Sequence, residues 1–156
     1  MTARDVPGVI APPPLIYLGF LFAGWGLGRL IVTPGFGLDG DIRRGLAVVL
    51  VIGGLTLEAM ALGLFRRLGT PPQPWKPTTA LATGGVYRFS RNPIYLGFTL
   101  IYAGFAVAMD SPVALAGLLP CLIVIDRFVV AREERYLDVK FGQEWRAYRA
   151  QVRRWL

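Results

Sequence analysis

Four long apolar blocks limit what this chain can fold into more than any other feature of the sequence. They occupy residues 15–32, 45–65, 93–109 and 112–131. A helix needs roughly 20 apolar residues to cross the hydrocarbon core of a bilayer. Because lipid offers no partner to backbone N–H and C=O groups, a spanning segment of this length must satisfy them internally as a helix. The sequence therefore predicts an all-α, polytopic membrane protein with four transmembrane helices.

Composition and length agree with one membrane domain. Hydrophobic residues make up 54% of the chain and charged residues 17%, whereas soluble domains carry about 25% charged residues. The 156 residues correspond to one domain at about 150 residues each, so we expect a single unit over 1–156. The chain has no histidine and one cysteine, Cys121. This excludes histidine-based triads, intrachain disulfides and multi-cysteine metal sites, and no metal centre is expected.

Two charged residues interrupt the fourth block. Asp126 and Arg127 follow Ile125, and the helix reaches spanning length only if it continues to residue 131. Adjacent helix residues do not face each other, so both side chains are expected to face protein, water or headgroups. Only a short turn at 110–112 separates the third block from the fourth, which predicts a tight helix hairpin.

The distribution of Lys and Arg predicts the orientation in the membrane. The loop 66–92 and the segment after the fourth block are rich in basic residues, whereas the turn between the third and fourth blocks has none. By the positive-inside rule, both termini and the long loop are predicted to be cytoplasmic, at the inner membrane of the cell. The net charge of +7 follows mostly from this bias, so nucleic-acid binding is not expected. The first block has no convincing small-residue cleavage site, so a retained helix is expected rather than a signal peptide.

The segment 132–156 is predicted to form an amphipathic helix. Apolar and aromatic side chains recur there at helical spacing, namely Leu137, Phe141, Trp145, Tyr148, Val152 and Trp155. Two arrangements are open: the helix lies in the headgroup plane with its basic residues on lipid phosphates, or the stripe packs on the protein's own cytoplasmic loop. Gly142 interrupts the stripe and is expected to mark a bend.

The polar, proline-rich loop between the second and third blocks ends in a chemically distinctive segment. A loop of this length without its own structure is uncommon unless it is functional. Arg91 has a planar guanidinium suited to carboxylates, and Pro93 suits the first turn of the third helix. Free N–H groups at that helix start favour an anion, and Gly97 allows a ligand or another helix to approach closely. The alternative for Arg91 is a membrane anchor, and for Tyr87 and Tyr95 an aromatic belt.

A second polar cluster, Glu133 and Glu134, follows directly after the fourth block. The predicted hairpin returns the chain to the side on which 91–93 lies, so the two clusters are expected to meet at one cytoplasmic surface. Adjacent carboxylates beside lipid are costly unless they are solvated, paired or bound to a ligand. The alternative is an exposed acidic start of a new helix, which the helix dipole favours.

These motifs resemble those of the membrane methyltransferase superfamily that includes isoprenylcysteine carboxyl methyltransferases and phospholipid N-methyltransferases. Its signature is Gly-x-Tyr and Arg-His-Pro-x-Tyr-x-Gly at the start of one helix, a Glu-Glu pair closing the next, and a Phe-Gly-x-Glu-aromatic stretch. The matching residues here are Gly85, Tyr87, Arg91, Asn92, Pro93, Tyr95 and Gly97, then Glu133 and Glu134, then Phe141, Gly142, Glu144 and Trp145. The resemblance covers residues 69–156.

The resemblance implies S-adenosylmethionine as the cofactor. It implies a cofactor site formed by Tyr87, Arg91, Asn92, Pro93, Tyr95, Gly97, Glu133 and Glu134. The tyrosines, Arg91 and Asn92 would contact the amino-acid end, and the glutamates the ribose hydroxyls or cationic groups. The implied reaction is an in-line attack on a sulfonium methyl, which needs orientation and desolvation more than acid–base groups.

Two departures from the family pattern affect the expected chemistry. Asn92 stands where many members have histidine, and an amide cannot titrate. Val129 and Val130 occupy the turn in which carboxyl methyltransferase members tend to carry an arginine. The second departure argues against a carboxylate as the methyl acceptor.

Glu58 is a further ionisable residue inside a predicted span. Such a residue is a functional candidate by default, and it either contacts the substrate or pairs with an arginine such as Arg66. The expected function is S-adenosylmethionine-dependent methyl transfer to a lipophilic or small acceptor (a thiol, amine, hydroxyl or carboxylate) that enters laterally from the bilayer at the cytoplasmic face. The alternatives are a non-catalytic membrane binding or assembly protein on the same scaffold and, less favoured because no nicotinamide site is visible, a membrane reductase.

Overall fold

The computed structural model describes residues 6–156, and every regular element in that range is helical. The elements are α1 (Pro13–Leu30), α2 (Gly40–Leu68), η1 (Gly85–Arg88), α3 (Pro93–Ala108), α4 (Pro112–Ala116), α5 (Leu118–Ile125), η2 (Asp126–Val130), α6 (Ala131–Phe141) and α7 (Gln143–Gln151). The predicted all-α class is confirmed for this range. Residues 1–5, which include the predicted cytoplasmic N-terminus, lie outside the described residues.

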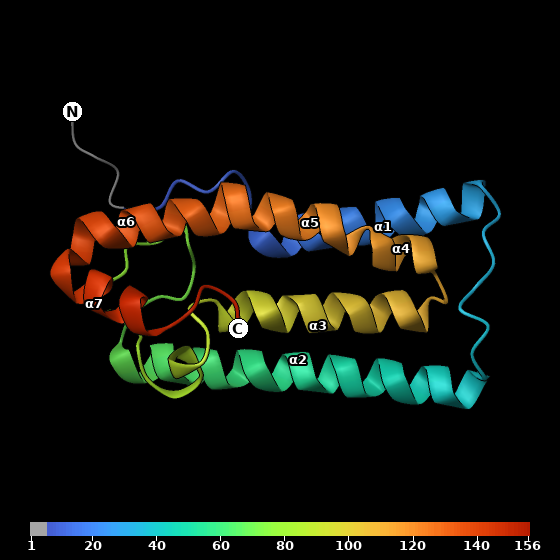
Figure 1. Ribbon diagram of the computed structural model, residues 1–156, viewed down its shortest axis with the longest axis horizontal. Helices are drawn as coiled ribbons and strands as arrows, with labels where there is room; N and C mark the ends of the chain where they lie inside the picture. Colours follow the sequence, from blue (N-terminus) through green and yellow to red (C-terminus); the bar gives the residue numbers. More distant parts are fainter. Residues whose placement is uncertain (1–5) are drawn as a thin grey trace.

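The long helices run side by side along the longest axis of the molecule (Figure 1). α2 packs against α3, and α1 packs against α4, α5 and α3. The Tyr17 hydroxyl on α1 donates to the Tyr95 carbonyl on α3 at 3.1 Å, which ties the two groups of helices together. The loop 69–92, α6 and α7 gather at one end of the molecule, whereas the α1–α2 loop lies at the other (Figure 1).

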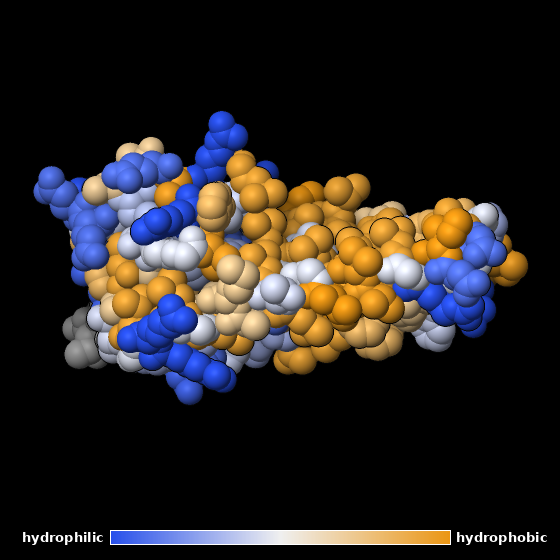
Figure 2. Space-filling model, turned by 90° about the horizontal axis from the view of Figure 1, so that it is seen from below, coloured by the Kyte–Doolittle hydropathy of each residue, from blue (hydrophilic) through white to orange (hydrophobic). Residues whose placement is uncertain are grey.

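Two helical runs are long and apolar enough to cross a bilayer, namely α2 and the run Pro112–Phe141. In the apolar 18-residue stretch of each run, only 11% of the residues of α2 and 28% of those of Pro112–Phe141 are buried inside the protein. Figure 2 shows apolar surface along the shaft of the molecule and hydrophilic residues at both ends. Exposed apolar surface on this scale suits hydrocarbon rather than water. α3 is apolar but shorter, and four spans remain a prediction.

Local signals explain where the helices begin and end. The Asp39 side chain accepts from the N–H of Asp41 and of Ile42, so α2 begins before the predicted residue 45. Gly69 ends α2 in the left-handed conformation (φ +62°), which costs glycine no Cβ clash. α3 begins at Pro93, whose missing N–H is not needed in a first turn.

Small residues let α2 and α3 approach closely. A Cβ at Gly97 would lie 2.6 Å from the Glu58 Cγ and 3.0 Å from the Gly54 carbonyl oxygen. A Cβ at Gly104 would lie 3.0 Å from the Ala47 carbonyl oxygen. Small residues at such contacts are typical of helix pairs in membranes. The close approach of another helix, one of the two roles expected for Gly97, is therefore present.

The helix does not end at residue 131, where the predicted fourth span gives way to the predicted tail. The helical run passes through a π-helical turn, η2, and continues as α6 to Phe141. Ile125, Val129 and Val130 of this stretch are fully buried in the main core cluster, so packing holds the run together across the charged residues. Gly142 (φ +53°, ψ −117°) then breaks the helix, and α7 follows as a separate element.

The aromatic stripe after residue 136 packs mainly on the protein itself. Trp145 and Tyr148 are buried in a cluster with Val86 and Tyr87 of the loop, and Leu137, Phe141 and Val152 pack against that cluster. The structure therefore supports packing of the stripe on the protein's own loop 69–92. It does not support a helix lying with this stripe in the headgroup plane.

Candidate active site

A cavity of about 290 Å³ lies between α1, α2, α3, α6, α7 and the long loop. This is close to the lower end of the range for small-molecule sites, about 300–1,000 Å³. Of the predicted cofactor residues, those lining the cavity are Tyr87, Arg91, Asn92, Tyr95, Glu133 and Glu134. Most of the remaining wall is apolar or aromatic, with Phe65, Trp75, Phe98 and Trp145 among its side chains.

Arg91, between η1 and α3, is the main cationic group of the cavity. Its Nη2 lies 3.0 Å from Glu134 Oε1, with both side chains less than a tenth exposed. Its guanidinium lies over the Trp145 ring, 5.7 Å from the centroid. Burial lowers the pKa of Arg91, and the Glu134 charge opposes that shift. Nε and Nη1 of Arg91 are buried with no hydrogen-bond partner in the described part of the chain.

The two adjacent glutamates have different surroundings. Both oxygens of Glu134 are engaged: Arg91 contacts Oε1, and Arg154 contacts Oε1 through Nε at 3.2 Å and Oε2 through Nη2 at 2.5 Å. Glu133 accepts at Oε1 from the Tyr95 hydroxyl at 2.6 Å. Its Oε2 has no hydrogen bond or ion pair within residues 6–156. Glu133 therefore retains acceptor capacity toward the cavity that Glu134 lacks.

The segment after α7 docks beside the start of α3. The Arg154 carbonyl accepts from Asn92 Nδ2 at 2.8 Å and from Ser90 Oγ at 3.2 Å, and the Arg153 carbonyl accepts from the Arg91 N–H at 3.0 Å. Asn92 therefore lines the cavity with its amide donor group already bound to the protein. This arrangement leaves less of Asn92 free for a cofactor than the sequence suggested.

A neutral hydrogen bond joins two of the buried tyrosines, Tyr148 and Tyr87. Tyr148 Oη donates to the Tyr87 carbonyl at 2.7 Å. Burial raises the pKa of both Tyr87 and Tyr148 above the usual phenol value. Both phenols are therefore neutral at physiological pH, and they shape the cavity as uncharged groups.

Three predicted residues lie outside the cavity wall. Pro93 is buried at the start of α3, and Gly97 faces α2. Glu58 sits against Gly97, one helical turn before the cavity residue Leu62, and does not itself line the cavity. Its Oε1 is buried without a hydrogen-bond partner in the described range, and no ion pair with Arg66 occurs there.

Comparison with known proteins decides the family. The family model for phospholipid methyltransferases matches residues 42–144, well over half of the chain. The chain belongs to the phospholipid methyltransferase family. The resemblance found in the sequence is thereby confirmed. An uncharacterized protein of Haemophilus influenzae is 41% identical over 63 residues, a match that covers 40% of this chain and 100% of that protein.

The segment matched to the phospholipid methyltransferase family contains Arg91, Glu133 and Glu134 but stops before several residues of this site. Trp145 and Tyr148 were visible in the sequence as a helical stripe, although periodicity alone does not tell a cavity wall from a core. Arg154 was counted only as a basic residue of the tail. The charge of Asp126 within an apolar block was the signal that a cation was needed nearby.

Proposed function

We propose that this family member is an integral membrane methyltransferase that uses S-adenosylmethionine. Its methyl acceptor is a lipophilic or small molecule bearing a thiol, amine, hydroxyl or carboxylate. The family match supports methyl transfer, and the exposed apolar helices support a bilayer setting. The cofactor is the one that the family resemblance implies, and the lining of the cavity fits it.

One observation carries the proposal: three buried hydrogen-bond donors on cavity-lining residues have no acceptor within residues 6–156. They are Nε and Nη1 of Arg91 and Nε1 of Trp145. A buried unsatisfied donor costs about 1–3 kcal/mol, and a guanidinium matches a planar carboxylate. A carboxylate is a suitable acceptor for donors of this kind, and S-adenosylmethionine carries one in its amino-acid group.

The remaining cavity groups fit the other parts of that molecule. Glu133, oriented by Tyr95, has an oxygen available for a hydroxyl or an ammonium group. Aromatic side chains provide apolar surface that excludes water. When bound, S-adenosylmethionine supplies a sulfonium methyl group for in-line attack by a nucleophile.

The chain's own residues are proposed to act mainly by binding and orientation, while burial raises the pKa of Glu133 to about 7 and leaves this carboxyl able to exchange a proton near neutral pH. Asn92 does not titrate, and Tyr87 and Tyr148 stay neutral. Such a site accelerates the reaction through orientation and exclusion of water. Val129 and Val130 are buried in the turn before the glutamates. No cation there is available for an acceptor carboxylate, so a thiol, amine or hydroxyl suits the site better.

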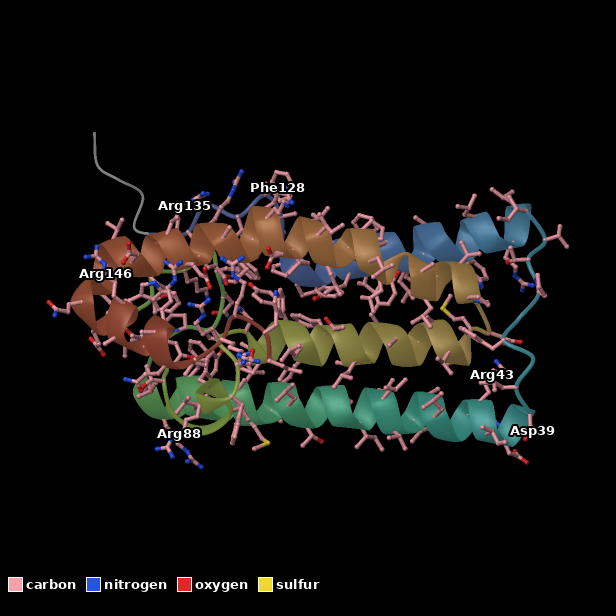
Figure 3. The ribbon with its side chains drawn as sticks, viewed as in Figure 1. Asp39, Arg43, Arg88, Phe128, Arg135 and Arg146 are labelled. Atoms are coloured by element: carbon pink, nitrogen blue, oxygen red, sulfur yellow. The ribbon has the colours of Figure 1, made fainter. Side chains whose placement is uncertain are left out.

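The proposed topology places the cavity on the cytoplasmic side of the inner membrane, with four spans. Figure 3 shows Arg88, Arg135 and Arg146 at the end of the molecule that holds the cavity, and Asp39 and Arg43 at the other end. Arg43 donates to the Ala108 carbonyl at 2.7 Å, so this cation serves a helix end. The excess of basic residues at the cavity end favours a cytoplasmic position for it.

Glu58 is the proposed acceptor-side residue. Its position one turn from Leu62 lies on the membrane side of the cavity. An acceptor that enters from the bilayer along α2 and α3 would pass it. Its unpartnered Oε1 offers a hydrogen-bond acceptor to an amine, thiol or hydroxyl.

Titration of the full-length, detergent-solubilised protein with S-adenosylmethionine tests the proposal. Arg91→Ala is expected to weaken binding at least tenfold, because loss of a hydrogen bond to a charged group costs about 1.5–3 kcal/mol of binding free energy. Arg88→Ala, which removes an exposed arginine nearby, serves as the matched control and is expected to bind like wild type. An absence of saturable binding to the wild type would overturn the proposal and favour a non-catalytic membrane protein. Incubation with methyl-labelled cofactor and a membrane extract then identifies the acceptor.

A further inference from the structure

The segment 152–156 turns back after α7 and places a second arginine against the glutamate pair (Figure 1). Arg154 Nη2 lies 2.5 Å from Glu134 Oε2, and its Nη1 lies 3.1 Å from Asp126 Oδ2. The indole N–H of Trp155 also donates to Asp126 Oδ1, at 3.0 Å. Arg154 therefore bridges two carboxylates from different parts of the helical run 112–141.

These contacts form a closed group of charges. Two arginines, Arg91 and Arg154, face two carboxylates, Glu134 and Asp126. Glu133 takes no part in the group and contacts Tyr95 instead. Hydrogen bonding to Glu134 and the charges of Glu134 and Asp126 raise the pKa of Arg154, whereas its partial burial lowers it. The group leaves Glu133 as the carboxylate open to a ligand.

We propose that Arg154 is a positioning residue of the cofactor site. This inference rests on the proposed function. Arg154 forms a fork with Glu134, from Nε to Oε1 and from Nη2 to Oε2. It therefore occupies Oε2 and shares Oε1 with Arg91, so that Glu134 holds Arg91 through Nη2 alone. Nε and Nη1 of Arg91 are then left without a partner among the described residues, and the cofactor carboxylate accepts from one of them, because Cδ closes the edge of the guanidinium between the two.

Removal of Arg154 changes what Glu134 needs. Its Oε2, now without a cation, is expected to draw the Arg91 guanidinium into a two-oxygen pairing, because planar arginine–carboxylate pairs favour two parallel hydrogen bonds. The donors that face the cavity then turn toward Glu134. The expected loss is therefore specific to ligands that carry a carboxylate.

Binding of S-adenosylmethionine to full-length variants tests this inference. Arg154→Ala is expected to weaken binding about tenfold. Arg154→Lys keeps the charge but not the planar fork, so its affinity is expected to lie between those of Arg154→Ala and the wild type. Arg153→Ala is the matched control, since the neighbouring side chain is exposed and its backbone carbonyl is retained. Equal affinities in Arg154→Ala and Arg153→Ala would overturn the inference.

Decarboxylated S-adenosylmethionine separates positioning from a structural role. If Arg154 acts through Arg91, Arg154→Ala is expected to bind this analogue with the affinity of the wild type. The Arg91→Ala/Arg154→Ala double variant is then expected to bind S-adenosylmethionine no more weakly than Arg91→Ala does. Equal weakening for both ligands would show a general collapse of the site and overturn the inference.

Asp126→Asn is a second variant that keeps the Glu134 contact, and it is expected to bind S-adenosylmethionine more tightly than Arg154→Ala does. If the wild type does not bind S-adenosylmethionine, the proposed function fails; if only Arg91→Ala loses affinity, the positioning role alone fails.

Discussion

Glu133 and Glu134 are neighbours in sequence, yet their contacts give them different expected roles. Glu134 is buried between Arg91 and Arg154, whereas Glu133 has one tyrosine partner and one oxygen open to the cavity. Adjacent residues on a helix point about 100° apart, so one can meet the protein and the other the ligand. The pair should therefore respond differently to the same substitution.

Glu133→Gln is expected to lower affinity for S-adenosylmethionine about tenfold with little change in thermal stability. Glu134→Gln is expected to lower the unfolding temperature by several degrees, because two arginines lose their shared carboxylate. Breaking a fully buried pair costs about 3–5 kcal/mol, and less is expected here since the Arg154 side chain is 32% exposed. Binding titration and thermal unfolding of both variants in the same detergent measure the difference. Equal responses in both measurements would contradict separate roles.

Individual site residues could be read from the sequence to different extents. Arg91 and the glutamates were identified because a charged residue at the start or end of an apolar block has few inexpensive environments. The engagement of Asn92 by the Arg154 carbonyl could not be predicted, because it depends on the chain reversing after α7. Glu58 was singled out as an ionisable residue inside a predicted span, but nothing in its spacing indicated that it would lie against Gly97.

At the level of elements, the α2–α3 pair gives the cavity a closely packed wall. Gly54, Gly97 and Gly104 bring the helix backbones together, and Glu58 lies in the contact. Leu62 and Phe65 of α2 face the cavity in the turns that follow. The separation of these two helices therefore affects the width of the cavity as well as stability.

Gly97→Ala is expected to destabilise the protein by about 1–3 kcal/mol, the usual cost of overpacking. Its Cβ would lie 2.6 Å from the Glu58 Cγ and 3.0 Å from the Gly54 carbonyl oxygen. Gly26→Ala on α1 is the matched control, because a Cβ there meets nothing within 4 Å. Thermal unfolding of both variants in the same detergent measures the effect. An unfolding temperature for Gly97→Ala at or above that of Gly26→Ala would contradict this prediction, because it would show that α2 and α3 accommodate the added methyl group without loss of stability.

Helix existence was predictable, whereas helix continuity was not. Hydrophobicity located all the long helices because their length and composition leave few other folds. The run from α5 through η2 into α6 was divided at residue 132 in the prediction, since the sequence changes there from apolar to charged. A helix continues through such a change when tertiary packing favours it. Here the burial of Val129 and Val130 in the core favours continuation.

At the level of the whole molecule, the two ends differ in charge and in structure. One end holds the cavity and the long loop, with Arg88, Arg135 and Arg146, and the other holds the α1–α2 loop and the start of α2, with Asp39 and Arg43 (Figure 3). An apolar shaft separates them (Figure 2). This polarity predicts a single orientation in the bilayer.

Site-directed labelling tests the orientation. Cys121 is buried and is the chain's one cysteine, so Cys121→Ala provides a background without thiols. In inside-out vesicles, an impermeant maleimide is expected to label Arg88→Cys and not Leu38→Cys. Right-side-out vesicles are expected to give the opposite result. Labelling of both positions from one side would contradict the proposed topology.

The packing partners of α1 also bear on biogenesis. This helix leaves the ribosome first among the described elements, but α4 and α5, against which it packs, are synthesised much later. The acceptor of the Tyr17 hydroxyl, the Tyr95 carbonyl, lies 78 positions later in the chain and is therefore synthesised much later. Under the proposed four-span topology, α1 is expected to contact lipid during translation until α4 and α5, its later packing partners, are inserted. Nascent chains stalled before α4 should accordingly expose α1 to lipid-borne photocrosslinkers, and chains stalled after α6 should protect it.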